Sequence, residues 1–179
     1  MKSTIVTLLT LMIALPPMVR AGTAKNVRPT SPHRLENASP SADVLVHRFL
    51  EALDKKDAAA LRHLRVTESE YRNIILRGTV PPGTPRRNYR EDVSQYFWGV
   101  LNGKSAGYEK NLLDDVGGHG PSKVKSLAYK KGETRYADYR AYKQLRLVVE
   151  DGAGQERDIA TGSIAEIGGQ YKFISFIRD

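Results

Sequence analysis

The chain has 179 residues, with 28 lysines and arginines against 20 aspartates and glutamates, and a net charge of +8 at pH 7. This length corresponds to one domain, which can bury a hydrophobic core without a metal ion or a disulfide to hold it together. The sequence contains no cysteine, which excludes disulfide scaffolds, thiolate zinc sites and a cysteine nucleophile.

Residues 1–24 have the pattern of a secretory signal peptide. A basic residue precedes an apolar run over residues 5–15, which a pair of prolines then ends. This run is shorter than the ~20 residues that a membrane-spanning helix needs. Small residues follow it, so we expect cleavage after Ala21 or Ala24. The mature protein is therefore expected to be periplasmic or secreted, without a transmembrane segment.

Residues 25–41 are rich in proline and serine and nearly lack large apolar side chains. Such a segment does not bury enough apolar surface to offset its loss of conformational entropy on ordering. We therefore expect a flexible linker here, followed by a single domain over residues 42–179.

Helical patterns run from residue 42 to residue 116. Apolar residues three and four positions apart predict a helix after Ser41 and a short helix after Asp57. Thr67 and Glu70 have the spacing of a capping box, in which each side chain binds the other residue's backbone N–H group. This spacing predicts a third helix.

The strongest helical stripe follows Asn88 and Glu91, which repeat the capping spacing. Its apolar members are expected to face the core: Val93, Tyr96, Phe97, Val100 and Leu101. Gly103 and Gly107 interrupt the pattern, and each costs roughly 1 kcal/mol relative to alanine inside a helix. We expect a kink or a break into two helices at these glycines.

Alternating patterns after Pro121 predict four strands, over residues 123–130, 136–150, 156–167 and 170–178. The connections between them are of hairpin length, which favours an antiparallel meander. In the second strand one face is expected to be buried: Tyr139, Ala141, Leu145, Leu147 and Val149. Helices followed by an antiparallel sheet indicate an α+β fold, with the helices packed on one face of the sheet.

Residues 46–53, followed by residues 57–61, and the closing strands at 162–167 and 170–177 resemble the opening and closing patterns of the NTF2-like superfamily. This cystatin-like α+β cone also occurs in SnoaL-like and ketosteroid-isomerase-type proteins. The resemblance implies a curved four-stranded antiparallel meander wrapped around the helices, with a pocket at the open end of the cone.

The chain is also similar to uncharacterised exported bacterial proteins of this superfamily. The similarity lies in a Thr-x-x-Glu-Tyr turn, here Thr67 to Tyr71, and in a Lys-Ser pair within the long helix, here Lys104 and Ser105. These patterns indicate architecture and say little about activity, because members of this superfamily include enzymes, carriers and dimerising modules.

Two ionisable residues are the catalytic candidates, Asp115 and His119. Asp114 and Asp115 lie at the expected C-terminal end of the long helix, where each negative charge opposes the helix dipole by ~0.3–1 kcal/mol. One of them could be a general base or a cation ligand; the alternative is ion pairing with Lys110 or Lys123. His119 lies in a glycine-rich turn that could hold it at a pocket mouth, whereas a solvated histidine is the alternative. No spacing typical of zinc ligands occurs, so neither a metal nor a cofactor is expected.

Aromatic residues are the candidates for ligand binding: Tyr71, Trp98, Tyr108 and Tyr139. Around the mouth of a cone they would suit an apolar or sugar-like ligand. The alternative is that the rings fill the core, with their polar atoms reaching its rim.

The fold pattern is complete whereas catalytic motifs are missing, so we expect a non-enzymatic module that binds a small ligand or a protein partner. The alternative is a small acid/base enzyme of the isomerase, dehydratase or hydrolase type, which would use a pocket carboxylate with a tyrosine. A homodimer through the outer sheet face, with Tyr142 and Val148 in contact, is a further alternative. Nucleic acid is not an expected partner for an exported protein.

Overall fold

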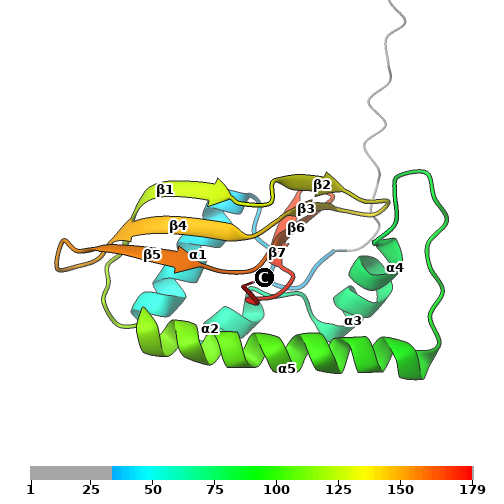
Figure 1. The fold of residues 1–179 in the computed structure, drawn as a ribbon, viewed down its shortest axis with the longest axis horizontal. Coiled ribbons are helices and arrows are strands. Elements are labelled where there is room, and N and C mark those ends of the chain that lie inside the picture. Colours follow the sequence, from blue (N-terminus) through cyan, green and yellow to red (C-terminus); the bar gives the residue numbers. More distant parts are fainter. Residues whose placement is uncertain (1–33, 179) are drawn as a thin grey trace, which may run out of the picture.

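The computed structural model describes residues 34–178 as an α+β fold, with helices in the first part of the chain and antiparallel strands in the second. The helical elements are α1 (Ala42–Asp54), α2 (Ala58–His63), α3 (Glu68–Glu70), the π-helical turn η1 (Tyr71–Ile75), α4 (Leu76–Gly78) and α5 (Glu91–Asp115). The strands are β1 (Lys123–Tyr129), β2 (Glu133–Arg135), β3 (Arg140–Tyr142), β4 (Leu145–Glu150), β5 (Glu156–Ala160), β6 (Ile164–Ile167) and β7 (Gln170–Phe173). The predicted signal peptide lies outside the described residues. Figure 1 shows α5 running along the side of the molecule away from the strands.

The first helices begin where the sequence predicts. The Ser41 side chain accepts a hydrogen bond from the Val44 N–H at the start of α1. Thr67 and Glu70 form a complete capping box at the start of α3. Each of these acceptors satisfies N–H groups that have no partner within the first turn of a helix.

The described part of the predicted linker, residues 34–41, is packed against the domain rather than free of it. Leu35 is buried, and Ser39 forms an isolated antiparallel bridge with Tyr171 of β7. The Arg48 side chain of α1 donates to the carbonyl of Asn37 at 3.0 Å. The ordered domain therefore begins before residue 42.

α5 differs from its prediction in two ways. It is one continuous helix of 25 residues through both Gly103 and Gly107, without the expected break. Its buried side chains are also not the apolar stripe but a largely polar set: Ser94, Ser105, Glu109 and Leu112. No helix within residues 34–178, α5 included, is long and apolar enough to cross a membrane.

Polar contacts explain why the polar side of α5 faces inward. The Ser94 hydroxyl accepts from Arg72 at 3.1 Å, and the Ser105 hydroxyl accepts from the Phe176 N–H at 2.9 Å. Asn102 accepts from the nearly buried Arg65 at 3.3 Å. Because small polar side chains make these contacts, Tyr96, Phe97 and Val100 of the apolar stripe are left exposed, while Val93 and Leu101 are half-buried.

The strands form two antiparallel sheets, one ordered β1-β4-β5 and the other β2-β3-β6-β7. Backbone hydrogen bonds continue across the junction between them: Lys143 N–H donates to the Gly132 carbonyl at 2.8 Å, and Leu145 N–H donates to the Gly162 carbonyl at 3.1 Å. The meander is thus antiparallel throughout, as predicted, but it is divided at about its middle.

Gln144 divides the predicted strand 136–150 into β3 and β4. Its φ of 55° is left-handed, a conformation that extended strands do not contain. The alternation of faces changes at this residue. Ala141 packs in one core cluster and Leu145 in another, whereas the sequence predicted a single shared face. Tyr142 consequently packs beside the cluster that contains Leu145.

Tyr142, one of the two residues named for a sheet-to-sheet dimer, packs on the inner side of the sheet. Its ring lies half-buried between those of Tyr129 and Tyr171, at centroid distances of 5.1 and 6.4 Å. A dimer through the sheet stays a prediction, with Tyr142 as a less suitable contact than the sequence suggested. Val148 is half-buried on the other side of β4 from Leu147 and Val149.

The core consists of two clusters. The first centres on the rings of Phe49, Phe173 and Phe176, which lie between 5.1 and 5.7 Å apart and are fully buried. It joins α1 and α2 to β4 and β5. The second cluster joins η1 to β6, with Ile75 and Ala165 among its members.

Candidate functional site

Five aromatic side chains gather where η1, the loop before α5 and the first half of α5 meet. Tyr71 and Trp98 lie with their ring centroids 5.6 Å apart. Phe97 contacts both Tyr89 and Tyr96 edge to face, each at 5.9 Å. Burial, with a contribution from Tyr89, raises the pKa of Tyr71. Trp98 directly follows Phe97 in α5, so the two groups of rings adjoin along this helix. We call these five residues the aromatic surface.

The aromatic surface is unusual in its exposure. Tyr96 is 68% exposed, Phe97 is 39% exposed, and Val100 on the next turn of α5 is 40% exposed. A single exposed apolar side chain is common on soluble proteins. Rings that contact one another on the surface, next to the exposed Val100, form an apolar patch of the kind that interaction sites present.

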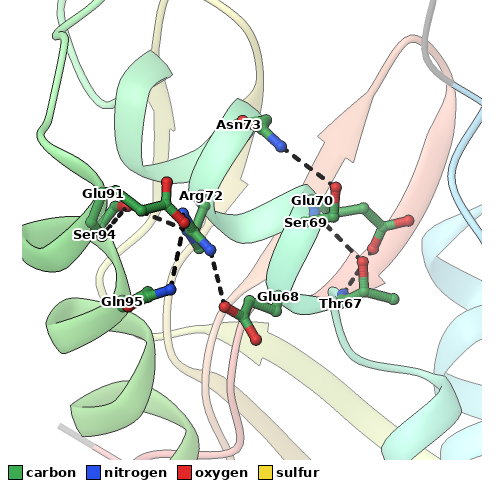
Figure 2. Close-up of polar contacts among 9 residues, drawn as sticks. All are labelled: Thr67, Glu68, Ser69, Glu70, Arg72, Asn73, Glu91, Ser94 and Gln95. Carbon is green, nitrogen blue, oxygen red and sulfur yellow. Dashed lines mark hydrogen bonds and ion pairs between the residues drawn. The ribbon is translucent and has the colours of Figure 1, made fainter.

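Arg72 holds η1 against the first turn of α5 (Figure 2). The neighbouring Tyr71 is thereby positioned beside Trp98. The Arg72 guanidinium donates to Glu68 at 3.0 Å and to Ser94 at 3.1 Å, and it also forms an ion pair with Glu91. The arginine side chain is mostly buried, at 18% exposure. Its contacts reach both helical elements and fix their relative positions.

The structure separates the four aromatic candidates that the sequence singled out. Tyr71 and Trp98 belong to the aromatic surface. Tyr139 is buried in the second core cluster, where its hydroxyl is hydrogen-bonded to that of Thr79 at 2.9 Å and where burial raises its pKa. Tyr108 lies in the other half of α5 and donates to the Arg178 carbonyl at 3.2 Å. The four residues therefore do not form one ring around a pocket mouth.

The two catalytic candidates also lie apart from the aromatic surface. Asp115 is exposed and borders a cavity of about 280 Å³ between the end of α5 and β5. His119 is exposed in the turn after α5, and its backbone carbonyl accepts from the Gly152 N–H at 2.8 Å. Asp114 forms an ion pair with Lys110 at 2.5 Å, which is the alternative that the sequence left open.

Glu109 and Arg65 form a buried polar site that sequence reasoning missed. Both residues are 5% exposed. Glu109 Oε2 and Arg65 Nε are buried without a hydrogen-bond partner in the described chain, while Arg62 lies 3.5 Å from the other carboxylate oxygen of Glu109. No sequence signal pointed to Glu109, because the apolar stripe of α5 indicated another inner face.

The carboxyl group of Glu109 is expected to titrate above its ordinary range. Burial raises its pKa, although the charges of Arg62 and Arg65 oppose the rise. The folded protein then binds this proton more tightly than the unfolded chain does, so the resulting stability is present at acid pH and is lost as the pH rises through the folded pKa. NMR titration of the Glu109 side-chain carboxyl carbon measures this pKa. Glu51, whose pKa is lowered by its hydrogen bond from Lys55, is the control and should shift the opposite way. A Glu109 pKa at or below the ordinary glutamate value would contradict this prediction.

Within residues 34–178 no group of three or more histidine, aspartate or glutamate side chains is placed to hold a metal ion. Comparisons with protein-family models, curated proteins and solved structures found no match to this chain.

Proposed function

We propose that the protein is a non-enzymatic module that binds a protein partner through the aromatic surface. The observation that carries this proposal is the edge-to-face group of Tyr89, Tyr96 and Phe97, in which Tyr96 and Phe97 are exposed and Tyr89 is half-buried. Aromatic rings with few rotatable bonds are the residues that contribute most of the binding energy in protein interfaces. The Arg72 contacts keep this surface in place before a partner binds, which lowers the entropy cost of binding.

A protein partner fits this surface better than a small ligand. Small ligands occupy concave sites, whereas Tyr96 and Phe97 stand on the outer side of a helix. None of the five cavities described for residues 34–178 is lined by a member of the aromatic surface. A flat or convex partner face would cover the rings directly.

For the architecture, we propose an exported protein with an NTF2-like cone. In this proposal β1 with β2, β3 with β4, and β5 with β6 are three long bent strands, and β7 is the fourth. The hydrogen bonds that cross the junction, from Lys143 N–H and Leu145 N–H, support this arrangement. The change of faces at Gln144 would supply part of the bend.

Site-specific photocrosslinking tests the aromatic surface. A photoreactive phenylalanine analogue replaces Tyr96 in the full chain, which is then irradiated in the cells that produce it. We expect a covalent adduct to a protein, either a second copy of this chain or another protein. Because a central aromatic contact contributes about 2 kcal/mol or more, Phe97→Ser in the same chain should weaken the interaction at least tenfold and remove most of the adduct.

Lys131 is the control position for the crosslinker, because it is exposed in the turn between β1 and β2 and lies outside the aromatic surface. Equal adduct yields at positions 96 and 131, or a yield that Phe97→Ser leaves unchanged, would refute the proposal. Phe97→Ser should lower the free energy of unfolding by at most about 1 kcal/mol, since Phe97 is exposed on the helix surface.

A small acid/base enzyme is the second candidate, and Asp115 is the observation that favours it. Asp115 borders a cavity whose lining also includes Asp158, Arg157 and Arg178. Arg157 is paired with Asp151 at 2.7 Å, which leaves Arg178 as the cation closest in role to a substrate contact. Glu109, although buried, lines none of the five cavities described for residues 34–178. Turnover of a substrate that Asp115→Asn abolishes would favour the enzyme over the binding module.

A further inference from the structure

A cavity of about 340 Å³ lies beside the junction of the two sheets, far along the chain from the aromatic surface. Its polar lining includes Lys130, Arg146, Asp158, Thr161 and Arg178. Leu145 and Ala160 supply apolar lining. The volume falls in the range of small-molecule sites, and a few polar groups within an apolar lining are typical of them.

The cavity adjoins the one that Asp115 borders. The two cavities share three lining residues, namely Asp158, Ala160 and Arg178. Both cavities lie along β5, which is one of the two edge strands of its sheet. We call the combined space the β5 groove.

The charge of the first cavity is positive. Arg146 and Asp158 are paired, with Nε 2.7 and 2.8 Å from the two carboxylate oxygens. The Arg146 hydrogen bonds lower the pKa of Asp158, so this carboxylate stays ionised and neutralises the arginine. Lys130 and Arg178 add two further cations to the cavity lining, and both residues are exposed.

Thr161 adds a buried polar group without a partner. The residue is 1% exposed, and its hydroxyl is buried and makes no hydrogen bond within residues 34–178. A buried polar group that is left unpaired is destabilising, so native proteins nearly always satisfy it. Because Thr161 borders the cavity, a molecule that occupies the cavity can supply the missing partner.

We propose that the β5 groove binds a small organic anion, with a carboxylate or phosphate group between Lys130 and Arg178 and an apolar portion against Leu145 and Ala160. The threonine hydroxyl donates to or accepts from a polar atom of the bound molecule. Charge-assisted hydrogen bonds to the two cations provide the selectivity for anions. This site is separate from the aromatic surface and does not depend on a protein partner.

Titration of the full chain with three probes of similar size tests the site: phenyl phosphate, benzoate and benzyl alcohol. Binding is followed by NMR chemical shifts of the Thr161 and Ala160 amides. We expect both anions to bind and the neutral alcohol to bind at least tenfold more weakly. Tighter binding of phenyl phosphate assigns a phosphate group to the natural ligand, and tighter binding of benzoate assigns a carboxylate. Equal affinity for the alcohol and the anions would overturn the proposal.

Two substitutions separate a built site from general attraction to a basic protein. Lys130→Ala should weaken binding of the preferred anion about tenfold. Lys131→Ala removes the same charge one residue along, outside the cavity lining, and should change the affinity less than twofold. If Lys131→Ala weakens binding as much as Lys130→Ala, only the net charge attracts the anion and the proposal fails.

Thr161→Val distinguishes a ligand contact from a structural role. Valine has a similar shape and removes an unpaired hydroxyl, so the variant should unfold at the same or a higher temperature than the wild type. Its affinity for the preferred anion should nevertheless fall at least threefold. A variant of unchanged affinity would show that the hydroxyl does not contact the ligand and would overturn its assigned role.

Discussion

Lys172→Met is expected to lower the free energy of unfolding by about 3–5 kcal/mol, because it leaves a buried carboxylate without its cation. Lys172 is 1% exposed, and its Nζ lies 2.7 Å from Glu70 Oε2. The same carboxylate accepts from the backbone N–H groups of Glu36 and Thr67, each at 2.8 Å. The pair therefore joins β7 to the start of α3 and to the segment before α1. Chemical denaturation of the wild type and the variant measures the change.

Two further variants make this prediction specific. Lys125→Met removes the cation of an ion pair with Glu150 whose side chains are 46% and 30% exposed, and it should cost at most about 1 kcal/mol. In a double-mutant cycle, Glu70→Gln and Lys172→Met should show a coupling energy of about 2 kcal/mol, since the two groups are in direct contact. A coupling energy near zero would mean that the loss on replacing Lys172 comes from packing alone.

The pair also shows where sequence reasoning stops. A lysine within a strand is ordinarily on the solvent side, and its partner Glu70 lies 102 residues earlier in the chain. The capping box that involves Glu70 was predictable because its two residues are three positions apart. Local spacing thus revealed one role of Glu70, and only the assembled fold revealed the other.

The helices near the N-terminus were predictable for a similar reason. The apolar residues of α1 recur at helical spacing and are buried, among them Phe49 and Leu53. This helix can be predicted without knowing what it packs against, because an apolar face can pack against any hydrophobic core. The order of helices followed by strands was also predictable, because the spacing of the apolar residues changes from helical to alternating near Pro121.

The candidate site was only partly predictable. Tyr71 and Trp98 were singled out as aromatic residues, but the sequence predicted that Tyr96 and Phe97 face the core. An apolar stripe shows which side of a helix favours contact with another apolar surface. It does not show whether that surface belongs to the same chain or to a different molecule. In α5 the inner side is occupied by Ser94 and Ser105, whose hydrogen-bond partners are 22 and 71 residues away. Such distant polar contacts leave no periodic signal.

The β5 groove and the change of faces at Gln144 also depend on distant contacts. Glutamine does not mark a left-handed residue, whereas glycine or asparagine would have done so. The residues of the groove come from α5, β4, β5, the turn after β1 and Arg178 near the end of the chain. Their side chains converge only after the strands have paired.

Phe176→Ala is expected to cost about 3–5 kcal/mol, which is typical when a large aromatic side chain is removed from a core. Phe176 is fully buried and lies 5.2 Å from Phe173 and 5.7 Å from Phe49, ring centre to ring centre. The guanidinium of Arg65 also lies over its ring, at 5.7 Å. Alanine would therefore leave a cavity in the first core cluster and would remove a contact of a nearly buried cation.

The same substitution at Phe97 is the matched control, because Phe97 is 39% exposed on α5. Phe97→Ala should lower the free energy of unfolding by at most about 1 kcal/mol, while it weakens capture by a crosslinker at position 96. Phe176→Ala should do the reverse, provided that the chain still folds. It should lower the unfolding midpoint, while a crosslinker at position 96 still captures the partner. Equal losses of stability at the two positions would contradict the assignment of one ring to the core and of the other to a partner surface.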